Sequence, residues 1–365
     1  MRIGIFPGYD ESGASSRIRA YTLQRSLNAI GHDARLWNTN ADAVLLQKKL
    51  RAPTLSAILN SISPSATVVY DADDGGRALW YPIAPSTLRK VMIAADVVTT
   101  DTAGHREWLL QCSPRAVEII PDCVDYDPKG PVRSNANPGA LRILWFGHMT
   151  NIALFSRHVQ ALSSVRGAEL VAVTNASAIA DLSSRFPSVS FVPWSRATFL
   201  DVLRSCTASV LSHDGTALDY GKSNNRMITS ITWGVPAIVS RTPEYERTAR
   251  EAGVEDAVFS NDNELLAIVE RLRTEAARRQ YLDAAQPVVW ERYSPEAVAR
   301  QFCRMLERVK ENRIPSRVPG YFSWLGRAAQ GHVAAALAFE AAHFARRWKR
   351  ADLAPLVPSL REGER

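Results

Sequence analysis

The stretch GKSNNRMITSITWGVPAIVS, residues 221–240, places a lysine and three small polar residues directly before a predicted helix. In α/β proteins, the turn from the end of a strand to the start of a helix is a common place for a bound anion. The first N–H groups of a helix have no partner within it, and a lysine adds positive charge beside them. We therefore predict a pyrophosphate site in this turn; an exposed lysine beside Asp219 is the alternative. The residues of the predicted site are Lys222, Ser223, Asn224 and Asn225.

A second polar turn, FPGYDESGASSRIRAY at residues 6–21, follows the first predicted strand. Its glycines permit a tight or left-handed backbone, and its serines can cap the helix that follows. Two arginines then fall in the first turns of that helix, where a positive side chain opposes the helix dipole. A bound anion or a carboxylate would remove this conflict; local pairing with Asp10 or Glu11 is the alternative. The spacing is not G-x-G-x-x-G, so it does not indicate a nicotinamide site. The residues that we single out are Gly13, Ser15, Ser16, Arg17 and Arg19.

A third group of polar residues ends a buried strand, in VVYDADDGG at residues 68–76. Its carboxylates are Asp71, Asp73 and Asp74. Parallel sheets carry their ligands at the carboxyl ends of the strands. Carboxylates there can bind a metal, accept a proton or hydrogen-bond sugar hydroxyls, or they can simply cap the glycine turn.

The matching turn in the second half of the chain is WFGHMTN, residues 145–151. Gly147 lets the backbone approach a ligand closely, and Thr150 or Asn151 can cap the next helix. A plain helix cap needs no ligand, so this turn alone leaves both interpretations open.

The elements that must position these turns follow from the hydrophobic pattern. Short apolar strands alternate with helix-length amphipathic stretches, which is typical of parallel sheets with crossover helices. Strands are predicted at 2–6, 33–37, 42–47, 66–71, 96–101, 116–121, 141–147, 168–174, 188–193, 208–212, 235–240 and 256–260. Helices are predicted near 16–30, 53–61, 84–94, 102–112, 262–288 and 294–312. We predict an α/β protein with two tandem Rossmann-like doubly wound domains: 1–121, a linker at 122–140, 141–312, and a helical tail at 313–365.

The composition of the chain bears on where the protein is located in the cell and on whether one segment binds a membrane. The chain has 365 residues and a formal charge of +7, and residues 314–365 carry eight of its Lys and Arg against four Asp and Glu. The Ala-rich segment 321–350 predicts either a helix that packs on the body or an interfacial helix on an anionic membrane. The four cysteines lack metal-ligand or redox spacing, and no signal peptide or membrane-spanning run is present. We expect a cytoplasmic protein, peripheral at the inner face of the membrane, with no nucleic-acid partner.

The chain resembles GT-B-fold retaining glycosyltransferases of the glycosyl transferases group 1 type, over about residues 1–312. The segment FVPWSRATFLDVLRSCTASVLS, followed by GKSNNRMITSITWGVPAIVS, is similar to that family's V-P-W-S turn and its G-K-[SC]-x-x-[KR] block. IIPDCVD at 119–125 is similar to the I-P-N-G-V-D linker between the family's domains. Further similar segments are ADVVTTDTAGHREWLLQ at 95–111 and ERYSPEAVARQF at 291–302.

The resemblance implies a nucleotide-diphosphate sugar held between the domains, with no bound metal or other cofactor in the transfer step. It places the lysine that neutralises the donor diphosphate at Lys222, the glycine turn that faces the same phosphates at Gly147, and the base-side loop at Pro193 and Trp194. In our hypothesis, Arg17 or Arg19 adds a second positive contact, and one of Asp71, Asp73 and Asp74 orients the acceptor hydroxyl. We take Lys222, Arg17 and Asp74 as the catalytic candidates. Donor contacts are expected from Gly147, Asn151, Trp194, His213, Ser223, Asn224, Asn225 and Thr229. Acceptor contacts are expected from Gly13, Ser15, Ser16, Arg19, Asp71 and Asp73.

Two positions depart from the family pattern. The family usually has Glu in the helix after the lysine, reaching the donor ribose, and this chain has Thr229 there. The arginine that commonly follows the strand at 141–147 is missing, and His148 and Asn151 lie in its neighbourhood.

We therefore predict a retaining glycosyltransferase of cell-surface glycan or glycolipid synthesis. Its expected partners are a nucleotide sugar, a glycan or lipid-linked acceptor, and an anionic membrane surface bound through 321–350. A GT-B nucleotide-sugar epimerase and a non-catalytic GT-B-fold binding or scaffold protein are the alternatives.

Overall fold

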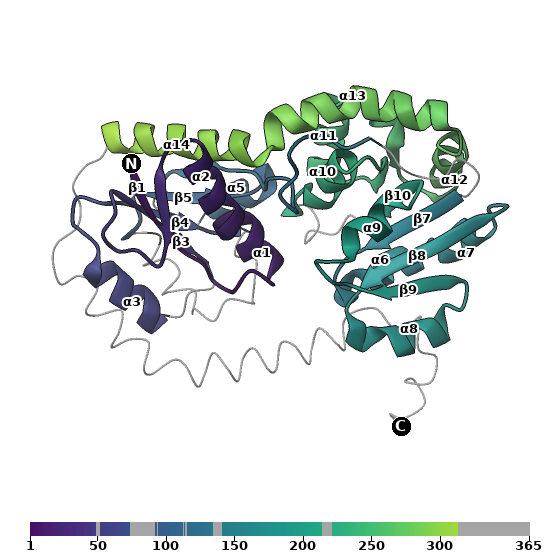
Figure 1. Ribbon diagram of the computed structural model, residues 1–365, viewed down its shortest axis with the longest axis horizontal. Coiled ribbons are helices and arrows are strands. Elements are labelled where there is room, and N and C mark those ends of the chain that lie inside the picture. Colours follow the sequence, from purple (N-terminus) through teal and green to yellow (C-terminus); the bar gives the residue numbers. More distant parts are fainter. Residues whose placement is uncertain are drawn as a thin grey trace. The chain divides into compact units, whose positions relative to one another are not determined.

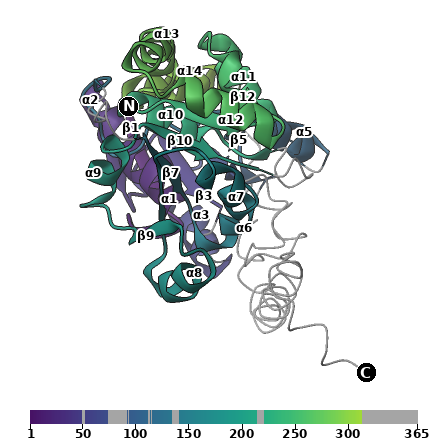
Figure 2. The same ribbon diagram turned by 90° about the vertical axis from the view of Figure 1, so that its right-hand side faces the viewer.

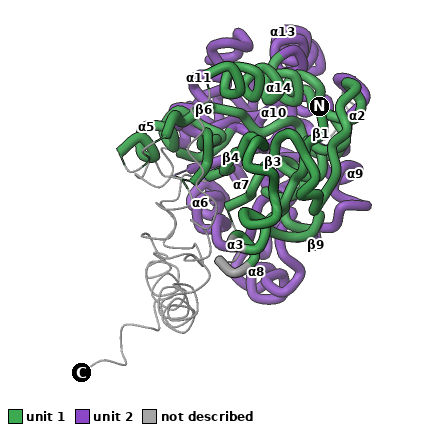
Figure 3. The backbone as a smooth tube through the Cα atoms, turned by 90° about the vertical axis from the view of Figure 1, so that its left-hand side faces the viewer, with its two compact units in different colours: residues 1–127, 221–223, 292–345 green, residues 128–220, 224–291, 346–365 purple. Residues whose placement is uncertain are grey.

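The computed structural model describes residues 1–48, 52–73, 92, 94–111, 113, 115–133, 141–213 and 221–312. The predicted tail lies outside these residues, as do Asp74 and most of the predicted helix at 84–94. Within them, the chain forms two compact units (Figure 3). The first comprises 1–127, 221–223 and the chain from Arg292 on; the second comprises the rest up to Glu291.

The first unit is built on a six-stranded parallel sheet with the order β2-β1-β3-β4-β5-β6 (Figure 1). Its strands are β1 (Arg2–Phe6), β2 (Asp33–Leu36), β3 (Ala43–Gln47), β4 (Thr67–Asp71), β5 (Val97–Thr100) and β6 (Val117–Ile119). Alternate side chains of a strand point to opposite faces. In β3, Ala43 and Leu45 therefore pack in one core, while Val44 and Leu46 pack in the other. Both faces are buried, which explains the nearly continuous apolar strands.

The helices of the first unit cover both faces of this sheet. They are α1 (Ala14–Ser16), the π-helical segment η1 (Arg17–Thr22), α2 (Leu23–Ala29), α3 (Ala52–Ser61), α5 (Ala103–Leu110) and α14 (Pro295–Glu311). The first three are continuous and correspond to the helix predicted at 16–30. The widened π-helical turn contains both Arg17 and Arg19.

Helix α14 belongs to the first unit, although the predicted boundary of 141–312 placed it in the second domain. It packs against α2 (Figure 1). Its apolar residues recur at helical spacing, so that Val298, Phe302 and Leu306 form one stripe and share a core with Leu23 and Leu27. The chain thus returns to the first sheet after completing the second.

The second unit also contains a six-stranded parallel sheet, with the order β12-β11-β10-β7-β8-β9. Its strands are β7 (Leu141–Phe146), β8 (Ala168–Thr174), β9 (Val189–Pro193), β10 (Ala208–Leu211), β11 (Ala237–Ser240) and β12 (Val258–Phe259). The strand order reverses direction at β7, because the chain passes from β7 to β8 and β9 on one side and then to β10 on the other.

The helices of the second unit alternate with its strands. They are η3 (Met149–Asn151), α6 (Ile152–Ser156), α7 (Val159–Ser163), η4 (Ala176–Ala178), α8 (Ile179–Arg185), α9 (Phe199–Arg204), α10 (Asn225–Thr232), α11 (Pro243–Glu251), η6 (Glu255–Ala257), α12 (Asp262–Arg271) and α13 (Glu275–Tyr293). Helix α8 lies beside the edge strand β9 in both views (Figures 1 and 2). The helix predicted at 262–288 is two helices, because the chain turns between α12 and α13.

The prediction of two doubly wound α/β units is confirmed, and each predicted strand is present. Of the cysteines, Cys123, Cys206 and Cys303 are buried and form no disulfide bond within the described part of the chain, and Cys112 lies outside it. None of the described helices has the length and hydropathy needed to cross a membrane.

Candidate functional site

The register of the first sheet aligns three polar residues at its carboxyl edge. Gln47 is paired with Asp71, and Asp71 with Thr99, so the three form a row across β3, β4 and β5. The alternation of side chains directs this row to the face covered by η1. Arg19 of that segment meets Asp71, with Nε 2.9 Å from Oδ2 and Nη2 2.6 Å from Oδ1. Thr99 donates its hydroxyl proton to the same carboxylate at 2.9 Å.

Arg19 is tied to a second carboxylate as well. Its Nη1 donates to Asp122 Oδ1 at 3.0 Å and to the carbonyl of Ile120 at 2.8 Å. Burial alone would lower the pKa of Arg19, but the charge of Asp71 and the hydrogen bonds to it outweigh burial and raise that pKa. Burial is also the main cause that raises the pKa of Asp122 to about 7, in spite of the opposing charge of Arg19. Arg19 and Asp71, both predicted to contact the acceptor, are thus paired with each other and buried.

Arg17 has a comparable partner elsewhere in the same unit. Its Nε is 2.9 Å from Asp125 Oδ1 and its Nη2 is 2.6 Å from Oδ2, and both side chains are buried. The guanidinium also lies 5.5 Å from the centre of the Tyr126 ring. We expected either a bound anion or a carboxylate to offset the unfavourable interaction of Arg17 with the helix dipole. In the structure, the carboxylate of Asp125 does so. Locally, Arg17 Nη1 also donates to the backbone carbonyls of Glu11 at 3.4 Å and of Ser12 at 3.2 Å. Arg17, which was predicted to act in catalysis, is 3% exposed.

The turn between β1 and α1 is held by Gln47. The Oε1 atom of Gln47 accepts hydrogen bonds from the Gly8 amide and the Ser16 hydroxyl, each at 2.8 Å. Ser16 Oγ in turn accepts from the Tyr9 amide at 2.9 Å. These two backbone donors are therefore occupied within the unit. Gly13 precedes α1 with φ −74° and ψ 122°, an extended conformation that does not use the left-handed freedom of glycine.

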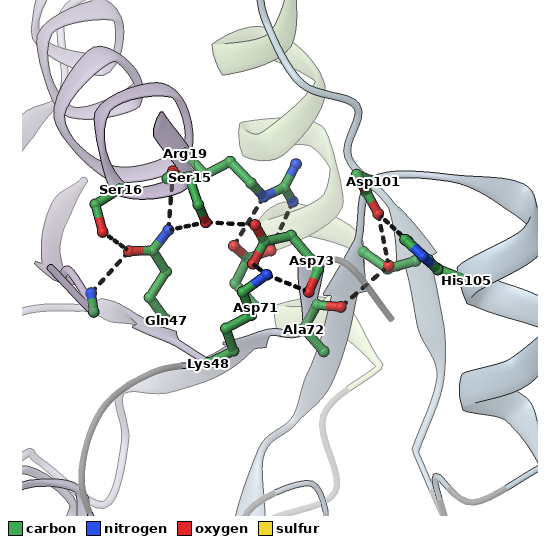
Figure 4. Close-up of polar contacts among 12 residues, drawn as sticks. Ser15, Ser16, Arg19, Gln47, Lys48, Asp71, Ala72, Asp73, Asp101 and His105 are labelled. Atoms are coloured by element: carbon green, nitrogen blue, oxygen red, sulfur yellow. Dashed lines mark hydrogen bonds and ion pairs between the residues drawn. The ribbon is translucent and has the colours of Figure 1, made fainter. Parts of the chain in front are cut away.

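Ser15, Asp73 and Lys48 form a chain of polar contacts beside this turn (Figure 4). Ser15 Oγ donates to Asp73 Oδ2 at 2.5 Å, and Lys48 Nζ lies 2.9 Å from Asp73 Oδ1. Lys48 also donates to the backbone carbonyl of Asp73 at 2.7 Å. Lys48 is 2% exposed and Asp73 is 4% exposed, whereas Ser15 is only partly buried. Lys48 and Gln47 were not among the predicted site residues, although two consecutive polar residues at the end of a buried strand are a usable signal.

A buried histidine at the start of α5 was also missed. His105 Nδ1 is 2.6 Å from Asp101 Oδ1 (Figure 4). Residues 221–223 are part of the first unit, and Thr102 Oγ1 donates to the carbonyl of Gly221 at 3.1 Å. A Cβ atom on Gly221 would lie 2.1 Å from His105 Nε2, so only glycine fits against this ring. These contacts fix the backbone directly before Lys222.

The residues of the predicted anion-binding turn, 222–225, differ in their exposure. Lys222 and Ser223 are partly exposed, and Lys222 forms no ion pair with any described residue. Asn224 is buried and donates from Nδ2 to Thr248 Oγ1 at 2.7 Å. Asn225 is the first residue of α10. Thr229 is 1% exposed, because it lies on the face of α10 that packs inside the second unit. The predicted donor contact at Thr229 therefore has its hydroxyl in the interior.

An arginine lies where the strand order of the second sheet reverses, at the carboxyl ends of β7 and β10. Arg226 Nη1 donates to the carbonyl of Phe146, the last residue of β7, at 3.1 Å. Its Nη2 lies 2.8 Å from Nε2 of His213, which follows β10. Since arginine only donates, His213 Nε2 accepts and the ring proton resides on Nδ1. Ligands of open α/β sheets bind in this position.

Gly147 provides the space that Arg226 occupies. A Cβ atom at this position would lie 3.3 Å from Arg226 Nη1 and 3.1 Å from the Trp145 ring. The Gly147 amide donates to the carbonyl of Val173 at 3.1 Å, so it is already bonded within the sheet. Arg226 was not among the predicted site residues, although it occupies the [KR] position of the quoted G-K-[SC]-x-x-[KR] block.

The remaining predicted donor residues lie at the same edge of the second sheet. Asn151 ends η3 and is partly exposed. Pro193 ends β9, and Trp194 directly after it is 38% exposed. Among the described residues, no group of three or more His, Cys, Asp or Glu is placed to hold a metal.

Known structures share this architecture. Sucrose-phosphate synthase from Thermosynechococcus elongatus superposes with a TM-score of 0.60 at 12% identity, covering 86% of this chain and 100% of that one. The chain has the GT-B fold. Anabaena HepE in complex with UDP gives a TM-score of 0.62 at 10% identity over 84% of this chain and 100% of that one. The lipopolysaccharide outer core galactosyltransferase WaaB gives 0.54 at 11% identity over 84% and 99%. No family model and no curated protein matches the sequence.

Proposed function

We propose that this protein is a glycosyltransferase that moves a sugar from a nucleotide-diphosphate sugar to an acceptor hydroxyl. The observation that carries the proposal is Arg226 at the point where the order of the second sheet reverses. The proposal extends to retention of the anomeric configuration and to a role in cell-surface glycan or glycolipid synthesis.

The chemistry of transfer explains why this cation matters. Cleavage of the bond between the anomeric carbon and the phosphate oxygen leaves negative charge on the diphosphate, and fixed positive groups lower the barrier. A guanidinium has five N–H donors. Two of those in Arg226 are used by Phe146 and His213, which hold the group in place. Its planar fork suits the oxygens of a phosphate.

Lys222 supplies the second positive group of the proposal. It precedes the first residue of α10 by three positions, and it has no ion-pair partner among the described residues. A flexible ammonium beside the first amides of a helix is suited to a diphosphate. HepE has been solved in complex with UDP, and with UDP and glucose. These complexes support a uridine nucleotide as the first donor to test.

The proposal can be tested by thermal shift with UDP-, GDP- and ADP-sugars, followed by product analysis. We expect at least one donor to raise the melting temperature of the wild type and to have no such effect on Arg226→Met. Arg250→Met is the matched control, because Arg250 is exposed on α11 of the same unit.

The outcomes separate the candidate functions. Nucleotide release that requires an acceptor supports transfer, and the anomeric coupling in the NMR spectrum of the product reports retention or inversion. Conversion of the donor alone indicates an epimerase. Absence of stabilisation by every nucleotide sugar favours a binding or scaffold protein with this fold.

A further inference from the structure

The chain leaves the first unit through two residues that have a left-handed backbone. Asp127 is the last residue of the first unit, and Pro128 is the first of the second. Tyr126 has φ 71° and Asp127 has φ 49°. Residues with a side chain disfavour this conformation by roughly 10-fold each, and the residue before a proline normally has an extended backbone. Such a backbone persists only where the surrounding contacts hold it.

The first of these contacts is a buried ion pair. Arg17 and Asp125, which we call the inner ion pair, have side chains that are 4% and 6% exposed. Asp125 Oδ1 also accepts a hydrogen bond from the Tyr126 amide at 2.8 Å, so the pair fixes the backbone where the left-handed segment begins. Because separation of two buried charges is costly, the inner ion pair stays closed in the native protein.

The second group of contacts is accessible to water. Arg25 of α2 has Nη2 2.9 Å from Asp127 Oδ2 and Nη1 2.9 Å from Glu11 Oε1. The three side chains of these outer ion pairs are 35–39% exposed. Exposed ion pairs contribute little to stability, and dissolved salt screens them. The outer ion pairs can therefore open while the inner ion pair remains closed.

The same two arginines hold the turn between β1 and α1. Glu11 and Ser12 belong to this turn, and their backbone carbonyls accept from Arg17 Nη1. Arg25 contacts the Glu11 carboxylate and the Asp127 carboxylate with one guanidinium. When Arg25 moves away, it leaves both carboxylates together, so the turn and the exit segment change at the same time.

The returning chain is tied to the outgoing chain at the same place. The Val124 amide donates to the carbonyl of Tyr293 at 2.9 Å, and the chain enters the first unit again at Arg292. The outgoing and returning segments are therefore bonded to each other inside the first unit, directly before Asp125. On the outgoing side, the first residues that can change conformation beyond this point are those that the two arginines hold.

We propose that residues 125–127 are a hinge whose movement is controlled by the outer ion pairs. With these pairs closed, Asp127 keeps its left-handed backbone, and the second unit has a restricted range of positions. With them open, Asp127 relaxes toward the extended backbone that Pro128 favours, and the second unit moves more widely. This inference goes beyond the proposed function, because it holds whichever reaction the protein catalyses.

The test measures the distance between the two units by double electron–electron resonance on the full chain. Spin labels are attached to Asn60→Cys on α3 and Ser184→Cys on α8, both at exposed positions, in a Cys112→Ser background. The other three cysteines are buried and are not labelled. We expect a narrow distance distribution at about 0.02 M NaCl and a broader one at about 0.5 M, because salt screens the outer ion pairs. The open population should rise by roughly 2- to 5-fold, as for the loss of one exposed ion pair.

Two variants and a control assign this response to the outer ion pairs. Arg25→Met should give a broad distribution at low salt, with no further change at high salt. Asp127→Asn should behave in the same way, because asparagine tolerates a left-handed backbone but lacks the charge. The double variant should match the single ones, since both changes act on one contact. Arg35→Met is the matched control, because the Arg35–Asp33 pair of the same unit is also exposed, and it should keep the wild-type response.

Hydrogen–deuterium exchange tests the link to the turn. Asp127 lies outside the turn, yet in Asp127→Asn the amides of Ser12 and Gly13 should exchange roughly 2- to 5-fold faster, because Arg25 is held less firmly. Circular dichroism confirms that each variant is folded. A wild-type distribution that does not change with salt, or a response of Arg25→Met equal to that of the wild type, overturns the hinge. Unchanged exchange in the turn overturns its link to the hinge. None of these measurements needs a nucleotide sugar, so they stand or fall apart from the proposed function.

Discussion

Replacement of Arg19 by methionine tests the buried network of the first unit. Methionine keeps the apolar stem but removes the guanidinium, which leaves two carboxylates, Asp71 and Asp122, without their positive partner. The side chains of this network are 5% exposed for Arg19, 2% for Asp71 and 11% for Asp122, so water cannot replace the lost contacts.

The magnitude follows from this burial. Breaking a buried ion pair by removing one partner costs about 3–5 kcal/mol, since the remaining charge stays desolvated. Domains are stable by only about 5–15 kcal/mol, so the first unit should lose a large share of its free energy of unfolding. We expect a loss of about 4 kcal/mol at pH 7.5.

The assay is urea unfolding followed by circular dichroism, with a separate transition allowed for each unit. Arg2→Met is the control, because the Arg2–Asp42 pair is 50% and 43% exposed and such surface pairs contribute little. A loss below about 1 kcal/mol for Arg19→Met would refute the reasoning, because it would mean that the two carboxylates are relieved without arginine.

Three further predictions concern single residues. Because burial raises the pKa of Asp122 from 3.8 to about 7, the native state holds this proton longer than the unfolded chain does; the free energy of unfolding should therefore fall as pH rises across that window, by at most ~4 kcal/mol. Asp122→Asn should flatten this slope in urea titrations at pH 4.5–7.5, and an unchanged slope would contradict the assignment. Lys222→Ala should weaken nucleotide-diphosphate binding in calorimetry by about 10-fold, as for one charged contact, while the melting temperature stays constant; equal affinity would show that the lysine does not meet the phosphates. Burial raises the pKa of Cys206 to about 11, so its thiol should resist a thiol reagent at pH 8 until urea unfolds the second unit; rapid labelling of Cys206 in the native protein, located by mass spectrometry, would argue against this burial.

The sheets of this protein could be predicted because each strand is a short apolar run bounded by turn residues. Burial on both faces makes that signal strong, as in β4, where every residue is buried. The residues at which the second unit ends were harder to predict from the sequence. Helix α14 follows the second sheet in sequence, but its apolar stripe packs in a core of the first unit. The sequence shows the stripe and does not show which unit the stripe packs against.

The candidate site could be predicted from the sequence only where a sequence motif lies at the carboxyl end of a parallel strand. The turn at Lys222 and the glycine at 147 lie where parallel sheets hold ligands, and spacing alone located both. The partners of Arg17 and Arg19 could not be found in this way, because Asp125 is 108 residues away from Arg17 and becomes its neighbour only through the fold. Position within the motif also did not reveal that Thr229 is buried, since the rotation of α10 directs that residue into the core.

The central claim is that Arg226 recognises the diphosphate of the donor. The direct measurement is calorimetric titration of the wild type and Arg226→Met with uridine, guanosine and adenosine diphosphates and with the matching monophosphates. The account predicts that the wild type binds one diphosphate at least about 10-fold more tightly than its monophosphate, and that Arg226→Met loses this preference. An equal preference in the two proteins would contradict it.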